Sequence, residues 1–374
     1  MDNLREVRKI DHIRQTLALE DGPQDNGFSH VHLIHNALPA LNVEEIDLSL
    51  SFLGKKVNSP LLINAITGGH QSVTEINRRL AQVAARKGLA LAVGSQSAGL
   101  RNPELWSSYS VVRENHPDGV IIANVNADTT VTEALRAIEV IEADGIQVHL
   151  NVAQELAMKE GDRHFRDWIK RISDLVQHSP VPVIVKEVGF GISKEVAFEL
   201  LDRGVTYIDV GGAGGTNFVS IELRRQSKEN RGFESWGIPT AMTLGEVIWA
   251  YQQKGIPFHE GAVIATGGIR NGWEAAKALA MGATAFGMAG SILKRLLLSV
   301  VPSQEERLIP QSSDLNGRIE AVEDYIDDFE QELLQAMVLT GSQNLQDLHG
   351  KPCIFTGRVK EWFEQREIVI QRNR

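Results

Sequence analysis

Short apolar runs alternate with amphipathic stretches along the chain from residue 60 onward. The runs are rich in Val, Ile, Leu and Ala and alternate little between apolar and polar positions, which is typical of parallel strands buried on both faces. A predicted helix follows each run, for example residues 130–143 after the third and 272–282 after the seventh. The eight runs cover residues 60–69, 89–96, 119–126, 145–151, 181–190, 207–215, 261–268 and 283–290.

This repetition of strand and helix indicates an α/β fold with a parallel sheet. Eight such units between residues 60 and 300 predict a TIM (β/α)8 barrel. A doubly wound sheet is the alternative, because it is built from the same units. The count of eight favours the barrel.

The remaining segments are expected to surround the barrel within a single domain. Residues 1–59 form an N-terminal extension, 60–300 the barrel, and 301–374 a C-terminal helix and tail, in which 317–341 is an acidic predicted helix. Residues 216–242 are predicted to form a long charged insert after the sixth strand. Loops of that length in a compact domain are usually lids or binding loops.

The stretch QVHLNVAQE, residues 147–155, raises a question about its polar side chains. Gln147, His149 and Asn151 alternate with apolar residues, so they share one face of the predicted fourth strand. That face is either solvent-exposed surface or part of an active site, because a TIM barrel carries its active site at the C-terminal ends of its strands. All eight of these ends are polar or glycine-rich: Thr67–Gly69, Ser95–Gln96, Asn124–Asn126, His149–Asn151, Lys186–Glu187, Gly211–Thr216, Thr266–Gly268 and Ala289–Gly290. One polar strand end is ordinary, whereas eight in a row favour a shared site.

Two of these ends suggest a phosphate-binding site. The sequences ATGGIRNG (265–272) and GMAGS (287–291) close the seventh and eighth strands, where TIM barrels often bind a phosphate. Small residues let backbone N–H groups approach an anion, the following helix N-termini favour negative charge, and Arg270 adds a cation. The glycine-rich GGAGGT (211–216) is not a Walker loop, because no Gly-Lys-Ser/Thr follows it.

Lys186 and Glu155 each have a structural and a functional interpretation. Lys186 could pair with Glu187 or extend along apolar surface, or it could place a cation beside the N1–C2=O edge of a flavin. Glu155 could be a helix-start carboxylate favoured by the helix dipole, or a Mg²⁺ ligand whose shell is completed by water and substrate phosphates. The residues alone leave both questions open.

The composition and net charge of the chain argue against several classes of function. The chain has 374 residues, a net charge of −10 and a pI of about 5.6, which argues against a large nucleic-acid footprint. The single cysteine, Cys353, cannot form an intrachain disulfide. With no signal-peptide core and no apolar run long enough to cross a bilayer, we expect a cytoplasmic protein without membrane contact.

Near the N-terminus, Arg8, Lys9 and His12 form a basic cluster that is either a solvated arm or a diphosphate-binding segment that folds over the barrel mouth.

Through these residues and motifs, the chain closely resembles the type 2 isopentenyl-diphosphate isomerases, which are flavin enzymes of isoprenoid synthesis. The resemblance extends from RKIDHI (8–13) to the C-terminal region. Its sharpest parts are QVHLNVAQE and PVIVKEVGFG, and it also includes NAITGG, AVGSQ, GGAGGTNF, ESWGIPT and GMAG.

The resemblance implies roles for individual residues. The positions that match FMN contacts are Ala65, Ile66, Thr67, Ser95, Asn124, Lys186 and Thr216, and those that match the FMN phosphate site are Gly267, Gly268, Ile269, Arg270, Ala289 and Gly290. The positions that match substrate binding are Arg8, Lys9, His149, Asn151 and Gln154, with His149 and Gln154 over the reacting carbons. Glu155 matches the Mg²⁺ ligand.

Two positions depart from the family pattern. Ile66 stands where the family usually has Met, which backbone contacts to FMN would tolerate. Ser97 stands where many members have Arg or Met, and Arg101 is a candidate to replace that cation.

The implied reaction converts isopentenyl diphosphate into dimethylallyl diphosphate. The terminal alkene carbon gains a proton and C2 loses one, so there is no net redox change. The family uses reduced FMN, with N5 as the proton carrier, and NADPH primes the flavin without being consumed in each turnover. A homo-oligomer, tetramer or octamer, is also expected. The alternatives are an FMN-dependent hydroxy-acid oxidoreductase, which would consume a redox partner, and a non-catalytic flavin-binding protein.

Overall fold

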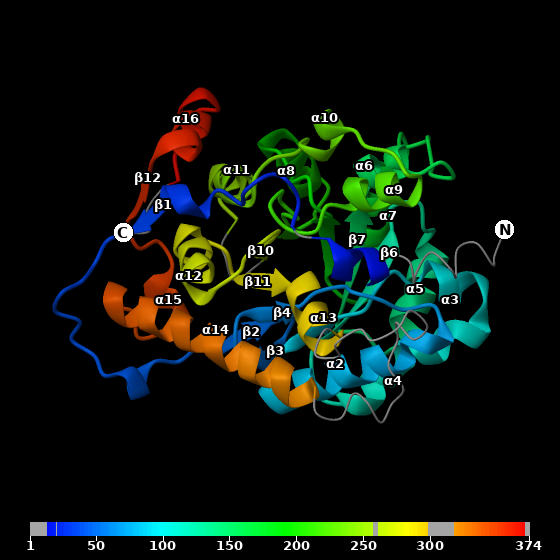
Figure 1. Cartoon of the computed structure of the whole chain (residues 1–374), viewed down its shortest axis with the longest axis horizontal. Helices are drawn as coiled ribbons and strands as arrows, with labels where there is room; N and C mark the ends of the chain where they lie inside the picture. Colours follow the sequence, from blue (N-terminus) through cyan, green and yellow to red (C-terminus); the bar gives the residue numbers. More distant parts are fainter. Residues whose placement is uncertain (1–12, 20, 257–260, 298–317, 371–374) are drawn as a thin grey trace.

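Eight parallel strands close into a barrel in the computed structural model, which describes residues 13–19, 21–256, 261–297 and 318–370 (Figure 1). The strands are β4 (Leu61–Ile63), β5 (Ala90–Ala92), β6 (Ile121–Asn126), β7 (Gly145–Leu150), β8 (Val183–Glu187), β9 (Tyr207–Asp209), β10 (Ala262–Thr266) and β11 (Ala285–Met288). Each lies within one of the eight predicted runs, and β11 pairs with β4 to close the ring. The predicted TIM barrel is therefore confirmed, and the doubly wound alternative is wrong.

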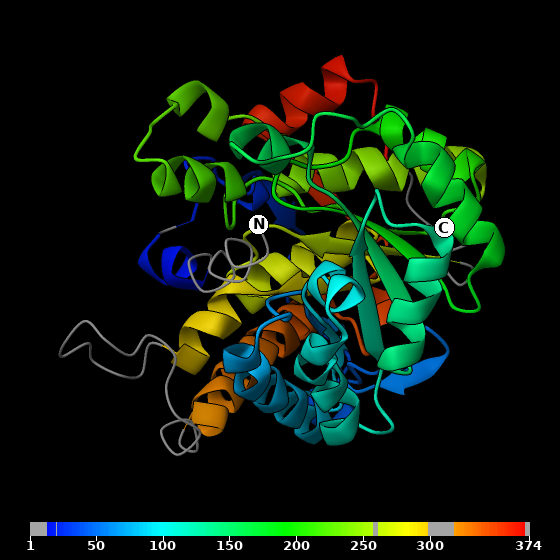
Figure 2. The same cartoon turned by 90° about the vertical axis from the view of Figure 1, so that its right-hand side faces the viewer.

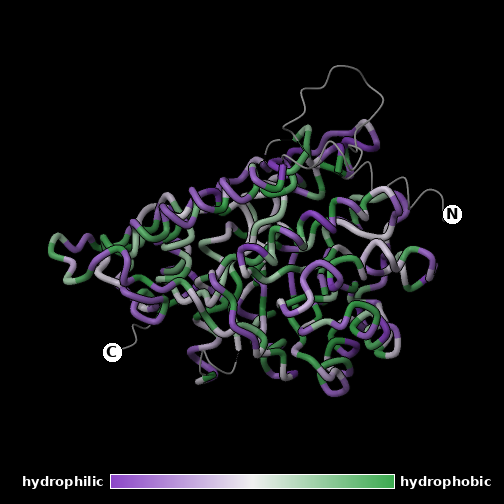
Figure 3. Tube along the Cα trace, turned by 90° about the horizontal axis from the view of Figure 1, so that it is seen from below, coloured by the Kyte–Doolittle hydropathy of each residue, from purple (hydrophilic) through white to green (hydrophobic). Residues whose placement is uncertain are grey.

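Helices cover the outside of the barrel. Those that follow the strands β4 to β10 in turn are α2 (Thr74–Lys87), α4 (Ser107–Asn115), α5 (Val131–Val140), α7 (Trp168–His178), α8 (Lys194–Asp202), α11 (Thr240–Lys254) and α12 (Gly272–Met281). In α5, Thr130 and Glu133 form a capping box, and the helix ends three residues earlier than predicted, because Glu142 adopts a φ of 47°. Figure 3 shows hydrophobic and hydrophilic residues alternating along the helical turns of the chain, as expected for helices with one buried face.

Shorter elements lie between and around these helices and strands. The short helices are α3 (Ser97–Arg101), α6 (Val152–Ala157), α9 (Phe218–Arg225), α10 (Arg231–Glu234) and α15 (Leu345–Leu348). The 3₁₀ turns are η1 (Phe28–His30), η2 (Val43–Glu45), η3 (Gln71–Val73) and η4 (Pro103–Trp106). The predicted insert at 216–242 is confirmed as a long excursion after β9. It folds into α9 and α10, and its last three residues already belong to α11.

The barrel interior is closed at the N-terminal ends of its strands. There the antiparallel hairpin of β2 (Leu50–Phe52) and β3 (Lys55–Val57) packs Phe52 and Val57 against an interior cluster of strand residues. Leu53 in the hairpin turn lies against Gly145, the first residue of β7. Because this end is filled by apolar side chains, a ligand has access to the barrel from the opposite, C-terminal end.

Two segments far apart in the sequence pair with each other on one side of the barrel. Strand β1 (Val31–Leu33) pairs antiparallel with β12 (Cys353–Phe355), and α16 (Gly357–Gln365) follows. The predicted C-terminal helix is confirmed as α14 (Arg318–Thr340), which lies beside α13 (Gly290–Leu297) in both Figure 1 and Figure 2. Within the described residues, no helix has the length and apolar character needed to cross a membrane.

Candidate active site

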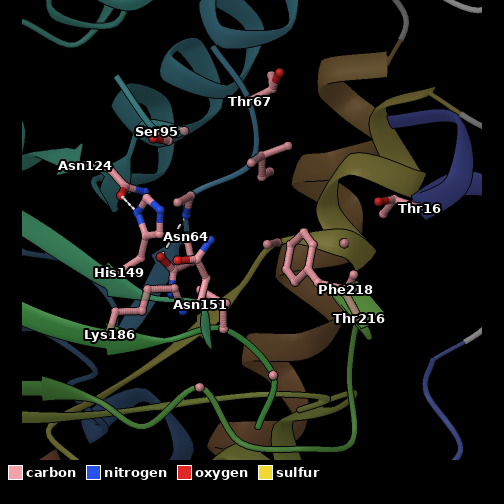
Figure 4. Close-up of a pocket in the computed structure, with 18 of the residues that line it drawn as sticks. Thr16, Asn64, Thr67, Ser95, Asn124, His149, Asn151, Lys186, Thr216 and Phe218 are labelled. Atoms are coloured by element: carbon pink, nitrogen blue, oxygen red, sulfur yellow. Dashed lines mark hydrogen bonds between the residues drawn. The ribbon is translucent and has the colours of Figure 1, made fainter. Parts of the chain in front are cut away.

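A cavity of about 680 Å³ lies at the C-terminal ends of the barrel strands (Figure 4). All the predicted site residues that belong to the barrel line it: Ala65, Ile66, Thr67, Ser95, Asn124, His149, Asn151, Gln154, Glu155, Lys186, Thr216, Gly267, Gly268, Ile269, Arg270, Ala289 and Gly290. Ser97 and Arg101 line it as well. Arg8 and Lys9 lie outside the described residues, although Ile13 and Thr16, which follow them, are on the cavity wall.

The polar face of β7 points into the barrel. Gln147 is fully buried and donates from Nε2 to Asn64 Oδ1 over 3.1 Å, while His149 reaches the cavity. The alternate residues Ile146 and Val148 belong to the apolar core beneath the outer helices. The polar half of QVHLN is therefore interior and not solvent-exposed outer surface.

Asn124 fixes the orientation of His149. The imidazole Nδ1 lies 2.8 Å from Asn124 Oδ1, and Asn124 Nδ2 donates to Val93 O over 3.1 Å. Because the amide nitrogen is engaged with a carbonyl, Asn124 presents its oxygen to the ring, and a neutral His149 then carries its proton on Nδ1. Figure 4 shows these two side chains together on the wall opposite Thr216 and Phe218.

Three polar residues follow β7 at the start of α6. Asn151 Nδ2 donates to Glu155 Oε1 over 2.8 Å, and Glu155 Oε2 accepts from the backbone N–H of Asp162 over 2.8 Å. Gln154 Nε2 donates to the buried Glu222 Oε1 over 3.2 Å. The described residues contain no cluster of three or more His, Cys, Asp or Glu side chains suited to a metal. A single carboxylate at Glu155 still fits Mg²⁺, which usually takes one or two carboxylates and completes its shell with water and substrate phosphates.

Lys186 pairs with Asp209 and not with Glu187. Its Nζ lies 3.0 Å from Asp209 Oδ2 on the neighbouring strand. The Glu187 carboxylate instead accepts the backbone N–H groups of Phe190 and Gly191, at 2.5 and 3.1 Å. Burial raises the pKa of Glu187 to about 8, although these hydrogen bonds and the charge of Lys186 oppose the shift.

The loops after β10 and β11 form a glycine-rich rim of the cavity, which consists of Gly267, Gly268, Ala289 and Gly290. Gly267 and Gly268 have φ values of 113° and 71°, and a Cβ on either would come within 2.1 Å of a carbonyl oxygen of Gly212 or Gly214. Only glycine therefore allows this close approach of the loops after β9 and β10.

Ala289 and Gly290 lead into α13, so backbone N–H groups and a helix N-terminus face the same part of the cavity. Arg270 also lines the cavity, and it donates from Nη2 to Gly214 O over 2.6 Å and from Nε to Asp21 Oδ2 over 3.1 Å. This set of small residues, backbone amides and one guanidinium fits a phosphate group.

Several residues in or behind the cavity wall were not predicted from the sequence. Asn64 directly precedes the AITGG strand end, and Asp209 shares the inward parity of Gly211 in YIDVGG, so the period-two pattern contained a signal for both. Phe218 and Glu222 lie in the insert on α9, where no local pattern marks them. Their place beside Thr216 and Gln154 follows only from the packing of α9 against α6.

Known proteins resemble the chain in sequence. A family model described as FMN-dependent dehydrogenase matches residues 124–299. The isopentenyl-diphosphate delta-isomerase of Moorella thermoacetica is 43% identical over 360 residues, covering 96% of this chain and 96% of that protein. The isopentenyl-diphosphate delta-isomerase of Symbiobacterium thermophilum is 44% identical over 378 residues, covering 98% of this chain and 97% of that protein.

Solved structures resemble the chain in fold. A mandelate oxidase mutant with a monooxide FMN adduct superposes with a TM-score of 0.62 at 15% identity, covering 92% of this chain and 96% of that one. A mandelate oxidase mutant with (S)-mandelic acid gives a TM-score of 0.61 at 16% identity, covering 92% and 94%. At such identities the likeness extends to the barrel and not to the chemistry performed in it.

Proposed function

Because the chain belongs to the FMN-dependent isopentenyl-diphosphate delta-isomerases, we propose that it converts isopentenyl diphosphate into dimethylallyl diphosphate in the cavity at the barrel mouth. The observation that carries this proposal is the grouping of His149, Asn151 and Gln154 in one cavity with Lys186 and the glycine-rich rim. Binding a flavin and the diphosphate of a short apolar substrate requires polar side chains, a cation and backbone N–H groups in the same cavity.

The reaction is a 1,3-allylic proton shift. The terminal alkene carbon gains a proton and C2 loses one, so atoms and electrons balance without an external oxidant or reductant. When bound in its reduced form, FMN supplies the proton carrier at its N5 atom. The protein groups then bind, orient and shield the substrate.

The FMN-binding residues are proposed to form two groups. Ala65, Ile66, Thr67, Ser95, Asn124, Lys186 and Thr216 would contact the ring system and its ribityl chain, and Gly267, Gly268, Ile269, Arg270, Ala289 and Gly290 would bind the phosphate. The close approach of the loops at Gly267 and Gly268 supports the second group, because side chains are excluded there and backbone N–H groups are left to meet an anion.

His149 and Gln154 are the proposed substrate-orienting residues. Asn124 holds the His149 ring and Glu222 holds the Gln154 amide, so both side chains are pre-organised before a substrate binds. Asn151 lies between them in sequence and joins this wall to Glu155.

The diphosphate is proposed to bind at the outer part of the cavity. Glu155 would hold Mg²⁺ there, and the metal would offset the negative charge of the diphosphate. Arg8 and Lys9 are proposed to add two cations from the N-terminal segment, and Thr16 on the cavity wall supports this because it lies only seven residues beyond Lys9. We further propose NADPH as the reductant that primes FMN, and a homo-oligomeric protein in the cytoplasm.

The test is a product assay on the purified protein with FMN, NADPH, Mg²⁺ and isopentenyl diphosphate, in which dimethylallyl diphosphate is expected. His149→Ala and Gln154→Ala should each lower kcat by about 100-fold or more and keep FMN bound, as is usual for groups at the reacting atoms. His178→Ala, at the outer end of α7, is the matched control and should leave kcat unchanged. FMN binding without product would favour a non-catalytic flavin protein.

A further inference from the structure

A buried polar network lies behind the flavin-facing wall of the cavity. Asp209, at the end of β9, is 0% exposed and does not line the cavity. Lys186 does line it, and its side chain is 11% exposed. The register pairs Lys186 with Asp209 across β8 and β9, and with His149 across β7 and β8. The cation thus stands between the cavity and a carboxylate.

The Asp209 carboxylate has partners on both oxygens. Its Oδ2 accepts from Lys186 Nζ over 3.0 Å and from Asn64 Nδ2 over 2.7 Å. Its Oδ1 accepts from Thr266 Oγ1 and from the backbone N–H of Gly211 over 3.3 Å. A buried carboxylate persists only when its hydrogen bonds and its charge are satisfied in this way.

A long lysine side chain by itself has many rotamers and points wherever its ammonium group is solvated. Here one of the three N–H donors of Nζ is committed to Asp209, which leaves the others to face the cavity. The negative charge directly behind Nζ also weakens the positive potential that a ligand in the cavity experiences. Both effects depend on the charge of Asp209 and not on its volume.

We propose that Asp209 is a positioning residue: it holds Lys186 against the flavin site and moderates the positive charge that bound FMN meets. The inference rests on the proposed function, because it takes FMN as the ligand in contact with Lys186. Its consequence is that Asp209 controls how much better the site binds reduced FMN, which carries more negative charge, than oxidised FMN.

Asp209→Asn tests this directly. The variant keeps the size of the side chain and removes the negative charge, so the charge of Lys186 is no longer offset. We expect the preference for reduced over oxidised FMN to increase at least tenfold, a rise of about 30 mV in the midpoint potential for a two-electron couple. We also expect kcat to fall, because Nζ keeps only a neutral acceptor at residue 209 and is oriented less firmly.

Glu246→Gln is the matched control. Glu246 is also 0% exposed and paired with a cation, Arg366, at 2.9 Å, but it lies in the contact between α11 and the C-terminal end of the chain and does not line the cavity. Its replacement should leave the midpoint potential unchanged. A purely structural role for Asp209 would lower stability or FMN loading and leave the potential where it is, so an unchanged or lower potential in Asp209→Asn overturns the proposal.

A second pair of variants covers the case in which Asp209→Asn alone does not fold. Lys186→Met and the double variant Lys186→Met/Asp209→Asn differ only in the charge of residue 209, and the double variant buries no unpaired charge. The double variant should have the higher midpoint potential, and equal potentials would overturn the proposal. If the parent protein binds no FMN, the proposed function fails first. If the parent binds FMN and isomerises substrate while the potentials agree, only this inference fails.

Discussion

The side chains that face the cavity are held in place by polar groups behind or beside them. Asn124 orients His149, Asp209 holds Lys186, and Glu155 binds Asn151. Side chains held in this way lose little freedom when a ligand binds, which favours precise placement of reacting atoms.

Gly290→Asp is expected to abolish FMN binding. A Cβ at this position would lie 2.9 Å from Thr216 Oγ1, at the edge of the cavity, so the added carboxylate would meet the proposed phosphate site. Two negative charges in that space repel each other, so the purified variant should show no flavin absorbance. Gly232→Asp, at an exposed position on α10, is the control. Equal flavin content in a folded Gly290→Asp protein would reject the phosphate assignment.

Glu155→Gln is expected to remove activity or to weaken its dependence on Mg²⁺, with FMN still bound. Glutamine can accept the hydrogen bond from Asn151 but offers no charge to a metal. Initial rates over a series of magnesium concentrations give the answer. An unchanged rate with the same magnesium dependence would leave Glu155 as a helix-start carboxylate.

Glu187→Gln is expected to change how stability depends on pH. Burial raises the pKa of Glu187 from its usual 4.5 to about 8, so the folded state binds a proton that the unfolded state releases within this window. The contribution of this group is therefore fully present below about pH 4.5 and is lost as the pH rises through about 8. Glutamine keeps an oxygen for the N–H groups of Phe190 and Gly191 and has no proton to lose.

The measurement for Glu187 is denaturant unfolding of both proteins from pH 5 to 9. The variant should gain stability relative to the parent as the pH rises. Parallel curves over the whole range would show that Glu187 does not titrate there.

At the scale of secondary-structure elements, helices outside the barrel also contribute to the cavity wall. Helix α9 of the insert packs against α6 through a small cluster of Ala157, Val219 and Leu223, with Phe190 from the loop after β8. The insert is thus anchored beside the cavity, with Thr216 and Phe218 on its wall. On another side, Ile13 and Thr16 bring the start of the described chain to the same cavity.

Arg8→Ala is expected to raise KM about 30-fold or more, and deletion of residues 1–10, which removes Lys9 as well, should raise it further. A charge-assisted contact to a phosphate contributes roughly 2–3 kcal/mol, and about 1.4 kcal/mol corresponds to a factor of ten. FMN affinity should change little, because the proposed flavin phosphate site lies on the loops after β10 and β11. Lys360→Ala on α16 is a control for the loss of one surface cation. If the deletion leaves KM and kcat as they were, the N-terminal cluster is only a solvated arm.

Local patterns account for the barrel and for the polar character of its mouth. Each strand was marked by its own apolar run, and each polar strand end by its position after that run. The pairing of Lys186 with Asp209 was not predictable in this way, because Glu187 is the nearer acid in sequence and only the strand register brings Asp209 closer. The same holds for β1 and β12, which pair across more than 300 residues. Contacts of this kind depend on the closed fold and leave no local trace.

At the scale of the whole molecule, the barrel has its cavity at the C-terminal ends of the strands. The β2–β3 hairpin fills the other end, and α14 covers the outside beside α12 and α13. The same barrel, at 15% identity, carries oxidase chemistry in mandelate oxidase, so the fold does not decide between an isomerase and an oxidoreductase. The two differ in whether a redox partner is consumed.

The most direct test of the account is therefore the ratio of product formed to NADPH consumed. The protein would be incubated anaerobically with FMN, Mg²⁺, a large excess of isopentenyl diphosphate and a small, known amount of NADPH. An isomerase that only needs its flavin reduced should form many molecules of dimethylallyl diphosphate for each NADPH oxidised. Product that stops at one molecule per NADPH, or an absence of dimethylallyl diphosphate while NADPH is consumed, would contradict the account.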